Sequence, residues 1–537
     1  MNTTKKNRRT PEYKPLLYTT TIRNPERYKD LMHILLRYDD VVLDESSVEA
    51  IEKDLFRVGL YRPMRRLDSI SDKWKGANKG DVALYALTDE ETDFLYKANK
   101  QNHKEAGFPT GWLSRFDTQF KLMKVLGLVY YNLGDKIEFS TAGRLLANSV
   151  SIEIEAGLIT RKVLHPHYER LVFLNAFARH QRGNPFIREL NRNIPLVMLL
   201  QVIKLLNADP EYNNTGIGYH ELPLVLFWKD DNAEALYQRI KKLRQKWRYT
   251  PSNETIKQIC TEEILGGFKK FTLRSVVSEY PDDFIRKMRL TGLISLRGAG
   301  RFIDINHNED QTINYILTHY KEWYHPLSDE KKYFEYASTI VPYFDEVCTV
   351  LTVKTDAGKA LKRLSSLSEY ASDMVKKELS IIEKGGSSKH PTLRFIPAPA
   401  RLEFLTALAI CQTFEKVAVS PNYPCDDEGL PLSTAGGDKG DIECMEGSRG
   451  ILVEVTTAGG RTQTMMECWP VGRHLETFAK ESGDCNAEGV FVAPTLYIDT
   501  IDQFSWLKER KGLVVRSYKI SDFISFLEKS STLISIS

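Results

Sequence analysis

Two acidic residues in the last third of the chain are the side chains best suited to do chemistry. Asp441 begins the alternating segment 441–446, and Glu454 lies inside the run 451–457, after a turn at 447–450. The run around Glu454 is otherwise apolar and rich in β-branched residues, which predicts a central strand buried on both faces. A lone carboxylate there costs several kcal/mol unless it is paired or coordinated, so Glu454 needs a partner.

A hairpin between these two strands is expected to set Asp441 beside Glu454. Two carboxylates with no matching arginine in either strand repel each other, and a divalent cation that prefers oxygen ligands, such as Mg²⁺, removes the repulsion. A bound metal ion lowers the pKa of its water, orients it for in-line attack and neutralises charge on a phosphate. An Asp and a Glu on adjacent strands after a Gly-rich loop is the layout of PD-(D/E)XK nucleases. The alternative is a surface hairpin whose acids face water, which the apolar run around Glu454 disfavours.

The elements around these strands predict an α/β domain that follows a flexible joint. An apolar helix is expected over 400–414, and Glu403 is its only charged residue from Leu402 onward. The segment 385–391 contains two glycines, two serines and a proline, which cannot continue the charged helix predicted over 357–384. Beyond this joint, strands and helices alternate.

We therefore expect a multidomain α+β protein with three parts. Residues 1–310 form a mostly helical recognition region with winged-helix-like modules, residues 311–388 form a helical linker, and residues 389–537 form a PD-(D/E)XK-like nuclease domain. The length of 537 residues allows two to four domains at roughly 150 residues each.

Two segments of the N-terminal region share one plan, a helix, a glycine and two short strands joined by a Gly-containing turn. The first runs from Phe116 to Ser140 and the second from Asp283 to Ile305. This is the outline of a winged helix, whose basic flank and wing commonly meet DNA. A structural hairpin packed on helices is the alternative for either copy, and the presence of two copies in a basic region favours nucleic-acid binding.

A basic segment lies between the two copies, at 237–249, where six basic residues fall within ten positions and alternate with Trp247 and Tyr249. Basic side chains release counterions from phosphates, and aromatic rings can pack on sugars. The alternative is a solvated helix face, which is the usual meaning of a charge run. The candidate DNA contacts in this segment are Arg239, Lys242, Arg244, Lys246 and Arg248.

The charge of the chain is unevenly distributed. The 74 Lys and Arg residues against 71 Asp and Glu leave a formal charge of +3. Residues 401–537 carry 13 basic and 20 acidic residues, a net of −7, so the first 400 residues carry a net of +10. A basic majority joined to an acidic third suggests a polyanion-binding part beside a carboxylate-rich part.

Composition excludes several classes of protein. The content of 42% hydrophobic and 27% charged residues is ordinary for a globular protein and excludes disordered and fibrous classes. No run approaches the ~18 apolar residues of a transmembrane helix, so no membrane association is expected. The N-terminus lacks the apolar core of a secretory signal. The seven cysteines are scattered and never spaced CxxC, which argues for a reducing cytoplasm and against a zinc site.

Motifs in the last third support a resemblance to a known family. They are Thr434-Ala435-Gly436, Gly440-Asp441-Ile442-Glu443, Val453-Glu454-Val455-Thr456-Thr457, Thr462-Gln463, Glu467 and Pro470-Val471-Gly472-Arg473-His474. Together they closely resemble the catalytic domains of the AlwI family of type IIS restriction endonucleases, whose relatives include strand-specific nicking endonucleases. The resemblance extends to residues 18–27 and to residues 139–148, so it spans most of the chain.

The resemblance implies a site and a set of partners. Asp441 and Glu454 would bind Mg²⁺, Glu403 would complete the acidic, metal-binding centre, and Glu467 matches a further acid of the family. Arg23 and Arg27, in the N-terminal part of the resemblance, could contact DNA. The implied partners are double-stranded DNA, a transient homodimer or second nuclease subunit for double-strand cleavage, and a DNA methyltransferase, in the cytoplasm of a prokaryotic cell.

The chain departs from the nuclease motif at one position. Where a lysine would follow Glu454 by two residues, the chain has Thr456, which cannot offer a cation to the scissile phosphate. Gln463, Glu467 or Lys439 could take part of that role. His474 could touch phosphate, although packing or an ion pair is the better expectation for it.

The function predicted from the sequence is that of a type IIS restriction endonuclease. It would bind a short asymmetric DNA site and use Mg²⁺ to hydrolyse phosphodiester bonds a fixed distance away. The alternatives are a strand-specific nicking endonuclease, a subunit of a heterodimeric nuclease, a repair or resolvase nuclease that recognises DNA structure, and a non-catalytic winged-helix DNA-binding regulator.

Overall fold

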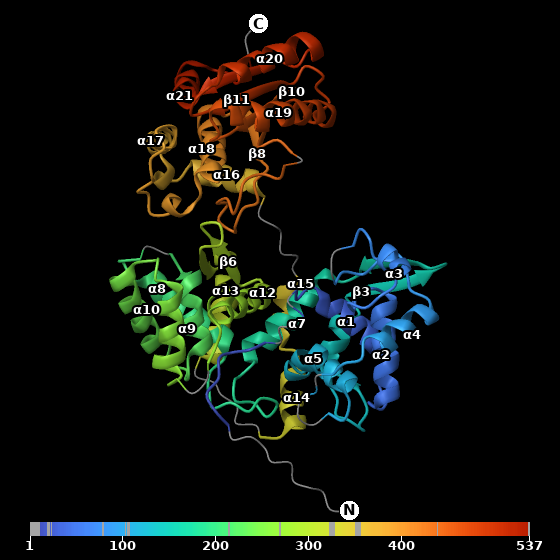
Figure 1. Cartoon of the computed structure of the whole chain (residues 1–537). Coiled ribbons are helices and arrows are strands. Elements are labelled where there is room, and N and C mark those ends of the chain that lie inside the picture. The colour runs from blue at the N-terminus through green and yellow to red at the C-terminus, as the bar shows by residue number, and fades with distance from the viewer. Residues whose placement is uncertain are drawn as a thin grey trace, which may run out of the picture. The chain divides into compact units, whose positions relative to one another are not determined.

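The computed structural model combines helices and sheets in two compact units (Figure 1). Unit 1 comprises residues 1–208, 220–294 and 309–352, and unit 2 comprises residues 209–219, 295–308 and 353–537. The residues whose placement the structure describes are 11–18, 22, 24–77, 80–102, 104, 108–212, 215–267, 270–321, 328–349, 356–437 and 439–534. The predicted DNA contact Arg23 lies outside them.

Unit 2 is built on a five-stranded mixed sheet with the order β12-β11-β10-β9-β8. Strand β9 is antiparallel to both of its neighbours, β8 and β10, whereas β11 runs parallel to its neighbours β10 and β12. The strands are β8 (Val417–Pro421), β9 (Ile442–Glu446), β10 (Arg449–Val455), β11 (Glu488–Ala493) and β12 (Val515–Lys519). Strand β10 is therefore central, and its residues from Gly450 to Val455 are buried, as the apolar run predicts.

Helices cover both faces of this sheet because the side chains of β10 alternate between them. Ile451, Val453 and Val455 join one core with α18 (Ala398–Thr413) and α21 (Ile520–Lys529). Leu452 packs in another core beneath α19 (Gly460–Ser482), which also contacts α20 (Ile498–Lys511). Glu454 lies two residues after Leu452 and therefore on the same face of the strand, the face that α19 covers.

The predicted elements of this part are confirmed except for one helix. The predicted helix over 400–414 and strands over 441–446 and 451–457 correspond to α18, β9 and β10. The single helix predicted over 357–384 is wrong: the chain forms α16 (Ala357–Ser365) and α17 (Ser372–Glu383). The break allows both helices to pack on α18, because their apolar residues join the same core.

A hairpin distant in sequence also belongs to unit 2. Strands β6 (Ile294–Arg297) and β7 (Phe302–Ile305) form a three-stranded sheet with β5 (Ile217–Gly218), in the order β5-β7-β6. The sequence grouped this hairpin with the helix over 283–290, which is α12 (Tyr280–Arg289) of unit 1. Within unit 2, the ring of Phe302 packs edge-on against Phe395.

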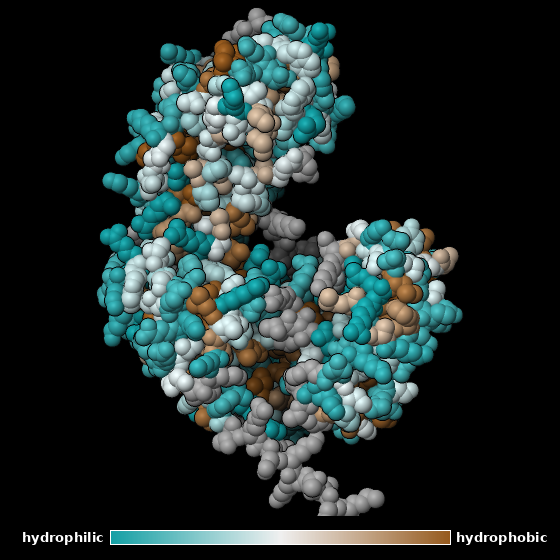
Figure 2. All heavy atoms as spheres, viewed as in Figure 1, coloured by the Kyte–Doolittle hydropathy of each residue, from teal (hydrophilic) through white to brown (hydrophobic). Residues whose placement is uncertain are grey.

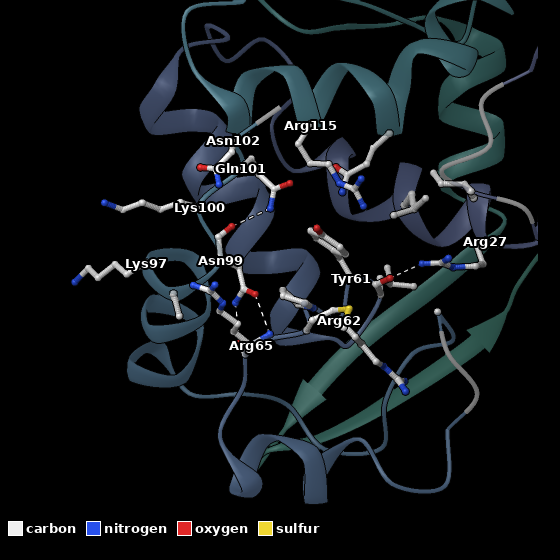
Figure 3. Close-up of a pocket in the computed structure, with 18 residues that line it drawn as sticks. Arg27, Tyr61, Arg62, Arg65, Lys97, Asn99, Lys100, Gln101, Asn102 and Arg115 are labelled. Atoms are coloured by element: carbon white, nitrogen blue, oxygen red, sulfur yellow. Dashed lines mark hydrogen bonds between the residues drawn. The ribbon is translucent and has the colours of Figure 1, made fainter. Parts of the chain in front are cut away.

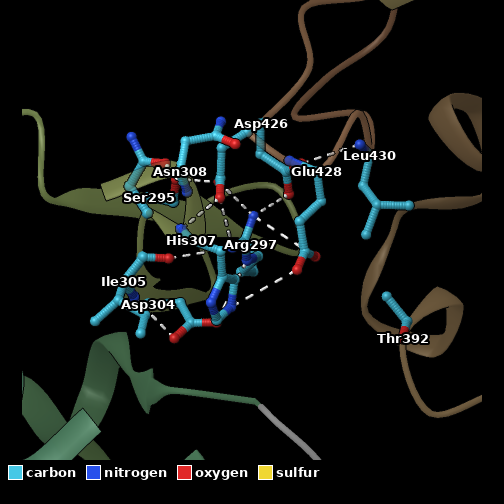
Figure 4. A network of polar contacts seen from close by, with 12 residues as sticks. Ser295, Arg297, Asp304, Ile305, His307, Asn308, Thr392, Asp426, Glu428 and Leu430 are labelled. Atoms are coloured by element: carbon cyan, nitrogen blue, oxygen red, sulfur yellow. Dashed lines mark hydrogen bonds and ion pairs between the residues drawn. The ribbon is translucent and has the colours of Figure 1, made fainter. Parts of the chain in front are cut away.

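The hairpin is held in unit 2 by one buried arginine (Figure 4). The Arg297 guanidinium lies 2.7 Å from Asp427 and 2.8 Å from Asp426, and it also reaches Asp304 at 3.4 Å. The backbone N–H of His307 donates to Asp427 as well. Asp426 and Asp427 lie in the loop after β8, whereas Asp304 lies on β7. The hairpin and this loop therefore form one charged cluster.

Unit 1 is mostly helical. Its principal elements are α1 (Arg27–Leu36), α2 (Glu45–Arg57), α3 (Asp68–Lys73), α4 (Asp89–Ala98), α5 (Gly111–Val125), β1 (Val129–Tyr130), β2 (Glu138–Phe139), α6 (Thr141–Ala147), β3 (Val150–Glu155), β4 (Leu158–Val163), α7 (Pro166–Arg179), α8 (Pro195–Ala208), α9 (Leu222–Phe227), α10 (Ala233–Trp247), α11 (Asn253–Gln258), α12, α13 (Asp310–Tyr320), α14 (Glu330–Ser338) and α15 (Pro342–Thr349).

The first helix-and-hairpin plan appears in unit 1 as α5, β1 and β2, with Gly127 in the left-handed region at the end of the helix. The sequence reasoning missed the longer antiparallel hairpin β3–β4 that follows α6. The face seen in Figure 2 is mainly hydrophilic, with scattered hydrophobic residues. Among the described residues, no helix combines the length and apolar composition needed to cross a bilayer.

Candidate active site

The register of β9 and β10 brings the two predicted acids together. Val453 pairs with Ile442, so the next position along sets Asp441 opposite Glu454. Glu454 is 6% exposed, and its side chain leaves the central strand on the α19 side. The hairpin therefore places two carboxylates side by side at the end of a buried strand pair.

Asp441 is held in this position by the backbone. The Val455 N–H donates to Asp441 Oδ2 at 2.8 Å, and the Asn422 N–H donates to the Asp441 carbonyl at 2.9 Å. Burial raises the pKa of Asp441 well above its usual range, and the charges of Glu454 and Glu403 raise it further. The site thus resists holding all its carboxylates ionised without a counter-charge.

Glu403 joins the cluster from α18, where it is 3% exposed in an otherwise apolar helix. Its Oε2 accepts a hydrogen bond of 2.9 Å from the Ala435 N–H, in the loop that leads to Asp441. Burial raises the pKa of Glu403 to about 7; this hydrogen bond opposes the rise, and the charge of Glu454 adds to it. The predicted acids Asp441, Glu454 and Glu403 therefore influence one another electrostatically.

His474 is the residue of this site that sequence reasoning undervalued. Its Nδ1 lies 2.8 Å from Glu454 Oε1, and its Nε2 lies 3.3 Å from the Gly437 carbonyl. Both neighbours are acceptors, so both ring nitrogens donate and the imidazolium is favoured. The hydrogen bond to Glu454 accordingly raises the pKa of His474, against the effect of burial. Glu467 and His474 are seven residues apart, which is two helical turns and places them on one face of α19. This spacing could have indicated from the sequence that His474 belongs to the site.

Thr456, at the position of the motif lysine, holds another acid. Its hydroxyl donates to Glu467 Oε1 at 2.8 Å. Burial raises the pKa of Glu467, although the Thr456 hydrogen bond works in the other direction. Gln463 is fully buried, and its amide binds the carbonyls of Ala458 and Thr495, so it is a structural brace. Lys439 is exposed and has no described contact with the acids.

The chemistry of these residues fits a magnesium ion. Within the described residues, no three His, Cys, Asp or Glu side chains are already arranged as a metal cage. Mg²⁺ usually keeps several waters and binds through only one or two carboxylates together with phosphate oxygens. Asp441 and Glu454 offer two adjacent carboxylates, and burial together with the charge of Glu454 raises the pKa of Asp441. The donor set therefore suits this ion without a preformed cage.

The predicted DNA contacts of the basic segment lie on α10 and just after it, and one of them is corrected. The side chain of Arg244 is 1% exposed and binds Glu221 through two hydrogen bonds of 2.7 Å. An arginine committed to a buried carboxylate is not available to a phosphate, so Arg244 is not a DNA contact. Arg239 pairs with Glu263 on the surface, whereas Lys242, Lys246 and Arg248 are exposed.

A family model identifies the class of protein. Residues 124–362 and 343–523, which together cover more than half of the chain, match the family described as AlwI restriction endonuclease. No curated protein matches the chain significantly.

Three solved structures are also similar. The small subunit (R.BspD6I2) of the heterodimeric restriction endonuclease R.BspD6I is 20% identical over 29% of this chain and 77% of that one, with a TM-score of 0.25. Restriction endonuclease FokI is 10% identical over 98% of this chain and 97% of its own, with a TM-score of 0.24. FokI bound to DNA is 11% identical with the same coverage and TM-score. At these TM-scores the likeness carries no further argument.

Proposed function

Because the chain belongs to the AlwI restriction endonuclease family, we propose that it is a Mg²⁺-dependent type IIS endonuclease. Unit 1 would bind a short asymmetric site in double-stranded DNA, and unit 2 would hydrolyse a phosphodiester a fixed distance away. The observation that carries the proposal is the pairing of Asp441 with Glu454 on buried strands beside Glu403. Three interacting carboxylates without an arginine have no structural purpose that outweighs their repulsion.

Each residue of the cluster has a role in this proposal. Asp441 and Glu454 would hold the ion, and Glu403 would add negative charge from α18. When bound, Mg²⁺ supplies a water of lowered pKa and neutralises charge on the phosphate. His474 orients the Glu454 carboxylate by its hydrogen bond to Oε1. Thr456 orients Glu467, which stands close enough to the other acids for the charge of Glu454 to raise its pKa.

Supercoiled plasmid incubated with the protein and Mg²⁺ tests the proposal. Nicked or linear DNA is expected with Mg²⁺ and intact plasmid with EDTA. The absence of both products would favour the non-catalytic winged-helix regulator. Sequencing of the cut ends separates the enzyme classes, because only a type IIS enzyme cuts at a constant offset from one short motif. Scattered ends at branched DNA would indicate a repair or resolvase nuclease.

Cleavage of both strands requires a second active site, and we propose that a second copy of this chain supplies it transiently. The support is an exposed apolar face on α19 and α20, which consists of Met465, Met466, Trp469, Ile498, Ile501 and Trp506. Met465 is 77% exposed and Met466 is 64% exposed. The Trp469 and Trp506 rings pack edge to face, with their centroids 5.6 Å apart. Contiguous exposed apolar residues of this kind mark interaction surfaces. Glu467 lies in the same stretch of α19, so a copy docked here would bring its acids near the first set.

The ratio of linear to nicked product tests this docking face. Replacement of Met465 and Met466 by glutamine is expected to reduce linear product while nicking continues, because these side chains are exposed and support no core. Leu367→Gln, at an exposed apolar residue of unit 2 outside the face, serves as the control. An unchanged ratio in the methionine variant would exclude this surface. A wild-type protein that makes only nicked DNA at every protein concentration would instead be a strand-specific nicking endonuclease or require a different subunit.

A further inference from the structure

A cavity in unit 1 is surrounded by basic side chains (Figure 3). It has a volume of about 880 Å³ and lies among α1, the loop after α2, the end of α4 and α5. Its walls include no Asp or Glu among the described residues, and its six cationic residues are Arg27, Arg62, Arg65, Lys97, Lys100 and Arg115. All of these residues precede residue 124, where the match to the family begins.

The cations of this cavity lack the partners that other buried cations of unit 1 have. Arg182 pairs with Glu189 at 2.7 Å, just as Arg244 pairs with Glu221. Among the described residues, no carboxylate forms an ion pair with any of the six cations of the cavity. Two of them donate to backbone carbonyls instead: Arg62 binds several carbonyls of the chain around it, and Arg27 donates to the Leu60 carbonyl. Arg65, Lys97 and Lys100 are exposed at the rim.

Two arginines deeper in the wall keep unused donors. The Nε atoms of Arg27 and Arg115 are buried and have no hydrogen-bond partner among the described residues. Gly80 lies so close to Arg27 that a Cβ there would collide with the guanidinium, so the glycine leaves room for it. Arg115 lies 4.6 Å from the centre of the Tyr61 ring, which keeps its planar group at the wall. A buried donor without an acceptor is costly, which indicates an absent ligand with acceptor oxygens.

The buried acid that acts on Arg115 does not neutralise that arginine. Glu52 interacts electrostatically with Arg115, yet burial raises the pKa of Glu52 to about 8 in spite of that arginine. Burial thus disfavours the charged form of Glu52. Asp30 and Asp81 act electrostatically on Arg27, yet the six cations of the cavity outnumber these acids. A concave site of one charge sign attracts an ion of the opposite sign.

We propose that this cavity binds a backbone phosphate of DNA, with Lys97, Lys100 and Arg65 at its mouth and Arg115 and Arg27 in its wall. The proposal rests on the proposed function, because it names where unit 1 contacts the substrate. Phosphodiesters present several acceptor oxygens to arginine and lysine donors. Met64, which is 92% exposed on the same rim, extends beside the mouth, where the sugars of a bound strand would pass.

Salt-dependent binding in EDTA tests the proposal without cleavage. The measurement is the fluorescence anisotropy of a labelled DNA duplex of mixed sequence, titrated with the full chain at several NaCl concentrations. The Lys97→Gln/Lys100→Gln variant is expected to bind more weakly, and its slope of log affinity against log salt should shrink by about 1 for each lost contact. Lys162→Gln/Lys332→Gln removes two exposed lysines of unit 1 from outside the cavity and should leave the slope nearly unchanged.

Several outcomes would overturn the proposal. Equal losses in the two double variants would show a general charge effect, and no loss in the cavity variant would exclude these lysines as phosphate contacts. Arg65→Gln, at another exposed rim residue, is a second test variant, and it should also weaken duplex binding and reduce the salt slope. Free deoxynucleotide or inorganic phosphate is the other source of the same chemistry. If either raises the thermal midpoint of the wild type but not of the cavity variant, while duplex affinity is the same in both, the cavity binds a small anion and not DNA.

The failure of this proposal is distinguishable from failure of the proposed function. In one outcome, the wild type cleaves plasmid while the cavity substitutions leave duplex affinity unchanged. That result would exclude the phosphate-binding role of the cavity and leave the proposed nuclease function intact. A wild-type protein that neither binds nor cleaves DNA would exclude both the proposed function and the cavity proposal.

Discussion

Unit 2 contains two groups of three neighbouring acids that differ in one respect. In the loop after β8, Asp426 and Asp427 pair with Arg297, and Glu428 lies 3.8 Å from the same guanidinium. At the candidate active site, Asp441, Glu454 and Glu403 have no arginine, and the cation they meet is His474. The first group is paired with an arginine of the same unit, whereas the second has only the imidazole of His474 as a cationic partner among the described residues.

The pKa shifts follow this difference at Asp427 only, because burial raises the pKa of Asp426 and Glu428 even though Arg297 opposes the rise. Burial alone would raise the pKa of Asp427, but Arg297 holds it below its usual range. Burial raises the pKa of Asp441 in the same way, and its neighbours raise it further because they are also acids. We expect the acid cluster with an internal arginine to stabilise the fold and the one without it to bind the proposed cation. The comparison yields four expectations, which run from the largest effect to the smallest.

The largest effect is expected from Asp441→Asn. If Asp441 and Glu454 hold Mg²⁺ as proposed, loss of one of the two carboxylates removes several kcal/mol of transition-state stabilisation, so cleavage should fall by at least ~10³-fold. The substitution also removes a repulsive charge, so the thermal midpoint should stay the same or rise. Plasmid cleavage and thermal unfolding measure the two effects. Asp502→Asn, at an exposed acid of α20, is the control; retained cleavage in the Asp441 variant would show that the acid cluster is not the catalytic centre.

At the compensated cluster, Arg297→Gln should change stability. Removing the guanidinium leaves Asp426 and Asp427 buried without a counter-charge, at a cost of about 3–5 kcal/mol. Urea denaturation measures the loss, and Arg301→Gln, on the same hairpin but exposed, should cost less than ~0.5 kcal/mol. A second substitution, Asp427→Asn, should restore part of the stability. If Arg297→Gln is as stable as the control, the cluster does not fasten the hairpin.

A smaller loss is expected from His474→Gln. A residue that orients a metal-binding carboxylate typically contributes 10–100-fold to metal affinity or activity, so cleavage should fall by about that factor. The Mg²⁺ concentration for half-maximal cleavage should rise, which a purely structural change would not cause. Arg473→Gln, at the exposed neighbouring position of α19, should have little effect. Equal effects of the two substitutions would show that His474 has no specific role at the candidate active site.

The smallest effect is the stabilisation of unit 2 by Mg²⁺ in the absence of DNA. An ion that binds only the folded state at 10 times its dissociation constant adds about 1.4 kcal/mol. For a unit of this size, each kcal/mol raises the thermal midpoint by about 2–4 °C. The rise should vanish in Asp441→Asn and persist in the Arg301→Gln control. A rise of the same size in Asp441→Asn would place the ion elsewhere.

Local patterns in the sequence were sufficient to predict the acid pair. An apolar β-branched run implies a buried strand, and a short turn implies an antiparallel partner, so Asp441 and Glu454 could be set side by side before any tertiary structure was known. Glu403 stood out in the same way, as one charge in an apolar helix. These inferences rest on periodicity and on neighbours that are close in the chain.

Contacts between distant segments could not be predicted. His474 reaches Glu454 because α19 packs on β10, and Arg244 is buried because Glu221 lies opposite it on another element. The hairpin β6–β7 belongs to unit 2 because Arg297 meets acids about 130 residues later in the chain.

The sequence by itself determined the family resemblance, the central strand and the pair of carboxylates, because each depends on residue types at short spacing. The tertiary structure decided which charges are neutralised. Arg244 and Arg297 form buried ion pairs because the fold brings a carboxylate to each of them. Arg115 lies in the wall of a cavity and forms no ion pair with a described carboxylate. Such an encounter between distant residues is a property of the packed chain, because the energy of an ion pair is set by distance and burial.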